Sequence, residues 1–302
     1  MAELRGGIDL GGTKIQTVVV DASGKVLGEA RQPTPTGGGP KDVAAAMAAS
    51  MREAAQGAGT ETSSLSGVGV GSPGDADEKT GVVSAAKNLP GWEGSFPLAA
   101  TLKEALGTEV RIGNDVQVAT EAEFQLGAAR EFQSLLGVFW GTGVGGGLVL
   151  DGKPWLGRGT AGEIGHMVVK RGGARCPCGR KGCMEAYAGR SAMEAEARRQ
   201  HKEGKHTDLF KLMEKHGKPR LTSGIWERAL DHGDHLAEHL IDRAVEALGT
   251  GVASAVNLLD PEAVIIGGGL GVRFGERLME PLMAEMHKHL FLDERPPAVR
   301  VA

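Results

Sequence analysis

Hydrophobic residues near the N-terminus alternate with polar ones at the spacing of β-strands. Two such runs, residues 7–10 and 15–20, flank a Gly-Gly turn, and a third run covers residues 25–32. Successive side chains of a strand point to opposite faces, so this spacing predicts three consecutive strands joined by short turns. The N-terminal segment is therefore predicted to form a β-meander with a glycine turn at its first bend.

The same layout returns in the second half of the chain. An apolar run at residues 135–140 leads into a glycine turn at 141–147, and a second apolar run ends near Asp151. A repeated supersecondary unit is typical of a duplicated architecture. We therefore predict two related lobes, residues 1–115 and 116–302, each with its own meander.

Elsewhere the apolar spacing predicts helices that alternate with short strands. The predicted helical regions are residues 41–57, 98–106, 116–127, 191–218 and 226–257. The predicted strands are residues 68–70, 110–112, 263–266 and 298–302, with a hairpin at 75–86 and a glycine turn at 267–271. Such alternation indicates an α/β fold.

Composition and charge reduce the number of functional classes to which the protein could belong. The 302 residues are 41% hydrophobic and 24% charged, with a net charge of -4. This balance gives no overall attraction to nucleic acid or to an anionic membrane. No apolar signal segment opens the sequence, and no apolar run approaches the roughly 18 residues of a spanning helix. We expect a cytoplasmic protein that binds neither nucleic acid nor membrane.

The three cysteines form one cluster in the sequence. Cys176, Cys178 and Cys183 fall within eight residues, and His166 lies ten residues upstream of Cys176. Thiolates and imidazole are the ligands of closed, tetrahedral Zn²⁺ sites. Reactive thiols, small buried residues without a special role, or a disulfide with one free thiol are the alternatives, and a long chain with no export signal disfavours the disulfide. We predict a structural Zn²⁺ site with no position open for substrate.

The two glycine turns have the composition of phosphate-binding loops. Their residues are Asp9, Gly11, Gly12, Thr13 and Lys14 in the first, and Gly141, Thr142 and Gly143 in the second. Turn N–H groups, a hydroxyl and an ammonium group can bind phosphate oxygens, while Asp9 is a candidate Mg²⁺ ligand. Simple hairpin turns are the alternative. The duplication favours phosphate binding for both.

A third glycine turn, with Gly268 and Gly269, follows an apolar strand. A turn at the carboxyl end of a strand suits the close approach of a nucleotide.

Taken together, these motifs resemble those of the ROK family of sugar kinases, and within it those of bacterial glucokinases. The matching segments are residues 9–14, 71–74, 88–92, 114–115, 141–147, 162–166, 176–185 and 267–269, in family order. The combination of Glu163 and His166 with Cys-x-Cys-Gly-x-x-Gly-Cys-x-Glu is the most specific part.

The resemblance implies a two-lobed actin-like ATPase (ribonuclease H-like) fold and ATP-dependent phosphorylation of the 6-hydroxyl of a hexose, with glucose as first choice. It implies Asp115 as the base at that hydroxyl, a role compatible with capping the following helix. It also implies Mg²⁺ and a homodimer or higher homo-oligomer. The implied sugar contacts are Asn88, Asn114, Asp115, Glu163, His166 and Glu185.

Several alternatives stay open within the resemblance. The sugar could be mannose, fructose, N-acetylmannosamine or N-acetylglucosamine, and polyphosphate could replace ATP. Sugar-responsive repressors of the family carry a DNA-binding helix-turn-helix ahead of the Asp9 motif, and about eight residues precede that motif here. We therefore expect a kinase. Family members usually continue past the last strand with a turn and a helix, whereas this sequence ends at Ala302.

Overall fold

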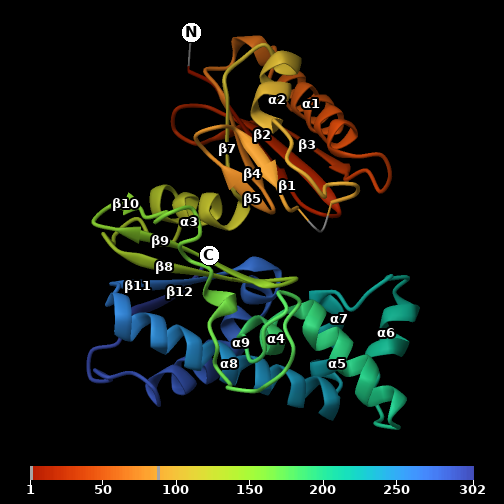
Figure 1. The fold of residues 1–302 in the computed structure, drawn as a ribbon, viewed down its shortest axis with the longest axis vertical. Coiled ribbons are helices and arrows are strands. Elements are labelled where there is room, and N and C mark those ends of the chain that lie inside the picture. The colour runs from red at the N-terminus through yellow and green to blue at the C-terminus, as the bar shows by residue number, and fades with distance from the viewer. Residues whose placement is uncertain (1–2, 87–88) are drawn as a thin grey trace. The chain divides into compact units, whose positions relative to one another are not determined.

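The computed structural model describes residues 3–86 and 89–302, which divide into two compact units, residues 1–119 and 120–302 (Figure 1). Each unit is built on its own five-stranded sheet. The division falls inside helix α3 (Asp115–Gln125).

The sheet of the first unit has the strand order β3-β2-β1-β4-β7. The first three strands, β1 (Arg5–Leu10), β2 (Lys14–Val20) and β3 (Val26–Pro33), are antiparallel and confirm the predicted meander. Strands β4 (Val68–Ser72) and β7 (Val110–Asn114) continue the sheet parallel to β1. The carboxyl ends of β1, β4 and β7 therefore share one edge, where candidate site residues follow two of them.

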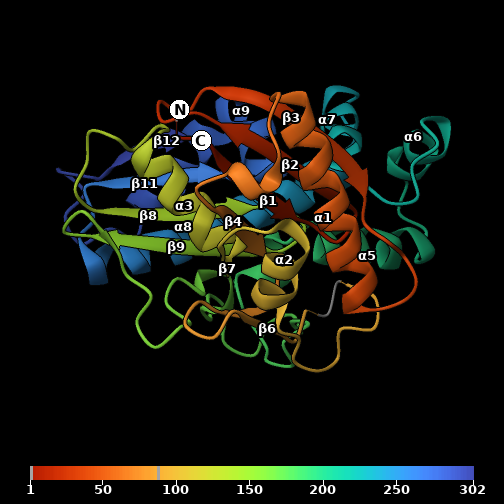
Figure 2. The same cartoon turned by 90° about the horizontal axis from the view of Figure 1, so that it is seen from above.

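Helices α1 (Pro40–Gly57) and α2 (Leu98–Leu106) cover one face of this sheet (Figure 2). Met47 and Met51 of α1 are fully buried, as their spacing of four residues predicts for one helix face. Burying a side chain of this size contributes about 1.5–3 kcal/mol. The predicted hairpin is also present, as β5 (Asp75–Asp77) and β6 (Val82–Ser84), and the short helix η1 (Thr62–Ser64) precedes β4.

The sheet of the second unit repeats the first. Its order is β10-β9-β8-β11-β12, with β8 (Leu135–Trp140), β9 (Val144–Leu150) and the short β10 (Lys153–Pro154) antiparallel. Strands β11 (Ala263–Gly267) and β12 (Ala298–Val301) run parallel to β8. Both sheets thus consist of a meander followed by two parallel strands, which confirms the predicted duplication.

Helices of the second unit occupy the predicted regions, and the structure adds the positions of the breaks within them. Residues 191–218 form two helices, α5 (Arg190–Lys202) and α6 (Leu209–Lys215), and residues 226–257 belong to α7 (Ser223–Asp231) and α8 (His235–Leu259). Asp234 explains two of these boundaries: its carboxylate accepts hydrogen bonds from Ala237 N at the start of α8 and from Thr207 Oγ1 before α6. A buried carboxylate with these partners holds both helix starts in place.

The glycine turn predicted at residues 267–271 is wrong in its extent. Gly267 is the N-cap of α9 (Gly268–His287), a helix that the sequence analysis did not predict. Buried Leu270, Phe274 and Leu282 place one face of α9 in the core. None of the helices in the described ranges is long and apolar enough to span a lipid bilayer.

Candidate functional site

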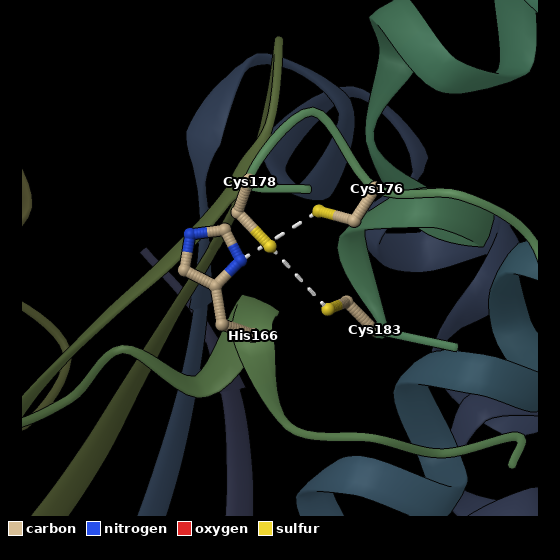
Figure 3. Close-up of side chains that lie close together, drawn as sticks. All are labelled: His166, Cys176, Cys178 and Cys183. Atoms are coloured by element: carbon tan, nitrogen blue, oxygen red, sulfur yellow. Dashed lines mark hydrogen bonds between the residues drawn. The ribbon is translucent and has the colours of Figure 1, made fainter. Parts of the chain in front are cut away.

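The predicted metal ligands converge in the second unit. The ligand atoms of His166, Cys176, Cys178 and Cys183 all lie within 4.8 Å of one another (Figure 3). Cys178 Sγ and Cys183 Sγ are 3.7 Å apart, and Cys176 Sγ is 3.8 Å from His166 Nδ1. A tetrahedral Zn²⁺ would set sulfur atoms about 3.8 Å apart, and sulfur about 3.6 Å from nitrogen. The residues therefore fit a closed zinc site.

The sulfur separation excludes a disulfide in this structure, because a disulfide bond measures about 2.05 Å. All three cysteines are free thiols. Of the alternatives to a metal site, reactive thiols and simply buried cysteines are left.

The cysteine loop is folded tightly by backbone contacts. Cys176 N donates to Arg180 O at 2.8 Å, and Gly179 N donates to Cys176 O at 2.9 Å. Gly182 has a φ of 86°, and a Cβ there would overlap the carbonyl oxygen of Lys170. Only glycine satisfies both conditions, which is why this position allows the loop to bring Cys183 back toward Cys176.

The environment of the thiols accords with a cationic partner. Burial raises the pKa of Cys176 and of Cys183, whereas a hydrogen bond from the Arg180 backbone lowers the pKa of Cys178 to about 6. Buried thiols become thiolates when a metal ion compensates their charge, and metal binding then releases their protons.

Three of the predicted sugar contacts lie beside this cluster. His166 ends the short helix η2 (Ile164–His166); its Nδ1 faces Cys176, while its Nε2 lies 3.8 Å from Glu163 Oε2. Glu185 begins the short helix α4 (Glu185–Ala188), and its Oε1 lies 3.8 Å from Cys176 Sγ. The structure thus brings Glu163, His166 and Glu185 together around the cysteine loop.

The second glycine turn is held by the segment that follows the cysteines. Glu185 Oε2 accepts a hydrogen bond from Val144 N at 3.0 Å. Gly141 O and Thr142 O accept hydrogen bonds from the N–H groups of Arg190 and Ser191 at 3.1 and 3.0 Å. A Cβ on Gly143 would overlap the Glu185 carboxylate, so a larger residue there would force that side chain to shift from its present position.

Gly268 and Gly269 lie close to the same turn. A Cβ on Gly141 would be 3.9 Å from Gly269 N, and one on Gly269 would be 3.5 Å from Ser223 Oγ. The two glycine segments predicted to bind nucleotide in this unit, 141–143 and 268–269, are therefore neighbours.

The first glycine turn joins β1 to β2 in the first unit. Gly11 N donates to Lys14 O at 2.9 Å, and Thr34 Oγ1 donates to Gly11 O at 2.6 Å. Gly12 and Thr13 at the tip are exposed. Desolvation raises the pKa of Asp9, and the positive charge of Lys14 opposes that rise. Asp9 thus lies close enough to Lys14 for their charges to interact.

The end of β7 carries the predicted base. A Cβ on Gly71 of β4 would lie 3.4 Å from Asp115 Cα, and Gly71 pairs with Asp9 of β1. Asp115 and Asp9 therefore lie at the same sheet edge, separated by a strand that has no side chain at Gly71.

Asn114 and Asp115 share the capping of α3. Asp115 is the first residue of the helix and its Oδ1 accepts from Val116 N at 2.9 Å, while Asn114 Oδ1 accepts from Val116 N at 3.0 Å and Gln117 N at 3.3 Å. Asn114 adopts this role because it precedes the helix and its amide oxygen reaches the free N–H groups. Asn88, the remaining predicted sugar contact, lies outside the described residues.

Sequence reasoning overlooked Arg190. Its Nη2 donates to Thr142 Oγ1 at 2.8 Å, linking the first residue of α5 to the glycine turn 48 positions earlier. The only signal in the sequence is an arginine after Gly189, which is too common to be informative.

Comparisons with known proteins agree with this geometry. The ROK family model matches residues 5–302. A glucokinase from Thermotoga maritima is 35% identical, over 91% of this chain and 84% of its own length. An N-acetyl-D-glucosamine kinase from Salmonella paratyphi A is 31% identical, over 98% of this chain and 93% of its own.

Solved structures are similar over nearly the whole chain. A ROK hexokinase from Thermus thermophilus has a TM-score of 0.80 and 34% identity, covering 98% of this chain and 92% of its own. A ROK family glucokinase from Streptomyces griseus, in complex with glucose and AMPPNP, has a TM-score of 0.82 and 30% identity, covering 99% and 93%. These matches confirm the two-lobed actin-like ATPase fold. The chain belongs to the ROK family.

Proposed function

We propose that this protein is an ATP-dependent sugar kinase that phosphorylates the 6-hydroxyl of glucose. The observation that carries the proposal is the contact of Glu185 with both the cysteine cluster and the second glycine turn. A residue that resembles a sugar ligand thereby touches a turn that resembles a phosphate loop. The glucokinase relatives from Thermotoga maritima and Streptomyces griseus support glucose as the substrate.

The family resemblance supports a set of proposed sugar contacts: Asn88, Asn114, Asp115, Glu163, His166 and Glu185. Carboxylates accept charge-assisted hydrogen bonds from sugar hydroxyls, which fix the orientation of the ring. Asp115 would accept the proton of the 6-hydroxyl as that oxygen attacks the γ-phosphorus of ATP. A base in this position contributes about 10²–10⁴-fold in rate.

The proposed donor site uses the glycine segments. Phosphoryl transfer requires positioning and neutralisation of charge more than covalent chemistry by the protein. Residues 11–14, 141–143 and 268–269 offer backbone N–H groups, hydroxyls and the Lys14 ammonium group, and Asp9 would hold Mg²⁺ directly or through water. When bound, Mg²⁺ neutralises charge on the phosphates.

The proposed Zn²⁺ is structural. Four protein ligands leave no open position on the ion, so its role would be to fix His166 and the start of α4, where Glu185 lies. A homodimer or higher homo-oligomer in the cytoplasm, where ATP is available, remains a prediction from the family resemblance.

The test is an ADP-release assay of the whole protein with Mg²⁺-ATP and a panel of hexoses and N-acetylhexosamines. We expect the highest kcat/KM with glucose and no ADP release without sugar. A preference for N-acetylglucosamine is the second candidate, favoured by the relative from Salmonella paratyphi A. That result would make N-acetylglucosamine the substrate in place of glucose, and ATP-dependent phosphorylation would remain the reaction. If no sugar of the panel causes ADP release, the proposal is overturned.

A further inference from the structure

Arg190 places a positive charge directly beside the second glycine turn. It is the first residue of α5 and is half-buried, and its Nη2 donates to the exposed Thr142 Oγ1 at 2.8 Å. The N–H groups of Arg190 and Ser191 already donate to carbonyls of the turn. The backbone of residues 190 and 191 is thus anchored to the turn, and the guanidinium group reaches the Thr142 hydroxyl from this anchored segment.

The charge of Glu194 acts favourably on Arg190, but the Glu194 carboxylate is bound to other groups. Glu194, one turn along α5, pairs with Arg198 through Oε1 at 2.6 Å and accepts from Leu221 N through Oε2 at 3.0 Å. Neither Arg190 nor the neighbouring Arg220 forms an ion pair with any residue of the described ranges.

The two arginines also act on each other. Desolvation lowers the pKa of Arg190, the charge of Arg220 lowers it further, and the charge of Glu194 opposes both effects. Two interacting like charges, one of them partly desolvated, favour binding of a further anion. A dianionic or trianionic ligand at the glycine turn would remove that repulsion.

In the hydrogen bond between Arg190 and Thr142, the guanidinium group is the donor and the hydroxyl oxygen is the acceptor. A hydroxyl oxygen that accepts from a guanidinium keeps its own proton available for a second partner. The exposed Thr142 hydroxyl therefore becomes a donor toward whatever occupies the turn. A phosphate oxygen, which is an acceptor only, fits this arrangement.

We propose that Arg190 is a positioning residue for the nucleotide: it orients the Thr142 hydroxyl toward a phosphate oxygen and supplies charge to the phosphate chain. The proposal rests on the proposed ATP-dependent function and adds a residue to it. Since this role concerns the phosphate chain alone, loss of Arg190 should weaken binding of the nucleotide and leave binding of the sugar unchanged.

The test compares Arg190→Gln with Arg199→Gln. Arg199 lies on the same helix, and its partners Glu196 and Glu203 are remote from the glycine turn. A lost hydrogen bond from a charged group corresponds to about tenfold in affinity or more. We expect Arg190→Gln to raise the KM for ATP about tenfold, with the KM for sugar unchanged, and Arg199→Gln to change neither.

Two further measurements separate phosphate binding from a general structural effect. Calorimetry should show that Arg190→Gln loses the most affinity for ATP, less for ADP and least for AMP. Arg190→Lys, which keeps a positive charge, should recover part of the lost affinity. The double variant Arg190→Gln/Thr142→Val should bind ATP no more weakly than the weaker-binding of the two single variants. The reason is that both changes remove the same interaction, the contact of the oriented Thr142 hydroxyl with phosphate.

Equal losses for AMP and ATP, or a raised sugar KM in Arg190→Gln, would overturn the inference. Absence of ATP binding by the wild type would also overturn it. If the wild type binds ATP through Arg190 but phosphorylates no sugar, the inference stands and the proposed function fails.

Discussion

Glu185 accepts a hydrogen bond from the backbone N–H of Val144, with 3.0 Å between Oε2 and N. This bond connects the residue two positions after Cys183 to the first residue of β9, directly after the second glycine turn. Any displacement of the cysteine loop is therefore transmitted to the turn through one carboxylate.

Glu185→Ala should destabilise the second unit and weaken sugar binding. It leaves the Val144 N–H without its acceptor, and an unsatisfied, part-buried donor costs about 1–3 kcal/mol. Urea unfolding should show that loss, whereas Glu185→Gln, which keeps an amide oxygen, should unfold near the wild-type midpoint. Glu246→Ala, an exposed change on α8, is the control. Unchanged stability of Glu185→Ala would show that the bond contributes little.

Asp115→Ala should remove turnover while changing the sugar KM by only a modest factor. Loss of a general base lowers kcat by about 10²–10⁴-fold, and a residue that acts on the proton in the transition state contributes little to ground-state binding. The ADP-release assay measures both constants. Asp242→Asn, an exposed carboxylate on α8, should keep the wild-type rate. A kcat of Asp115→Ala close to that of the wild type would exclude Asp115 as the base.

Cys178→Ser should lose bound zinc, which elemental analysis of the purified protein can measure against an equimolar content in the wild type. The melting temperature should fall, and the KM for sugar should rise, because His166 and Glu185 lose their fixed positions. Pro177→Ala changes an exposed neighbour that is not a ligand and should retain zinc. A wild type that is free of metal and has normal kinetics would exclude the zinc site.

Asp9→Asn should stabilise the protein at neutral pH and lower its activity. Because folding raises the pKa of Asp9, the charged carboxylate destabilises the fold above that raised pKa, and the penalty disappears below the unfolded value of about 3.9. The gain from Asp9→Asn should therefore be complete at neutral pH and vanish as the pH falls.

Thermal unfolding across this pH range, without added Mg²⁺, measures the effect of Asp9→Asn. Asp21→Asn is the comparison variant, because the pKa of Asp21 is lowered rather than raised by a side-chain hydrogen bond from Ser23. Removing the charge of the Asp21 carboxylate therefore should not stabilise the fold at neutral pH. A gain for Asp9→Asn that persists at the lowest pH would exclude the titration as its cause.

The features that were predictable from the sequence are those encoded over short distances. The first meander follows from the β-rich runs in residues 7–32, the second from the apolar runs on either side of the glycine turn in residues 135–150, and the metal cluster from the spacing of three cysteines. Each depends on neighbours in the chain, so the pattern is visible without the fold.

The features that were missed depend on contacts between distant segments or on conflicting local signals. Helix α9 begins with Gly268 and Gly269, residues that indicate a turn, and its helical state is determined by burial of Leu270 and Phe274 against the sheet. The bond from Arg190 to Thr142 joins residues 48 positions apart. The break before α8 depends on a carboxylate shared with Thr207.

The two sheets have the same strand order, but their crossover connections differ greatly in size. In the first unit, residues 34–67 lead from β3 to β4, whereas residues 155–262 lead from β10 to β11 in the second. The longer connection contains the cysteines, His166, Glu185 and Arg190. Both of its ends are fixed in one sheet, so the length and sequence of this connection can differ between relatives, and with them the ligand contacts, while the strand order of the sheet is kept.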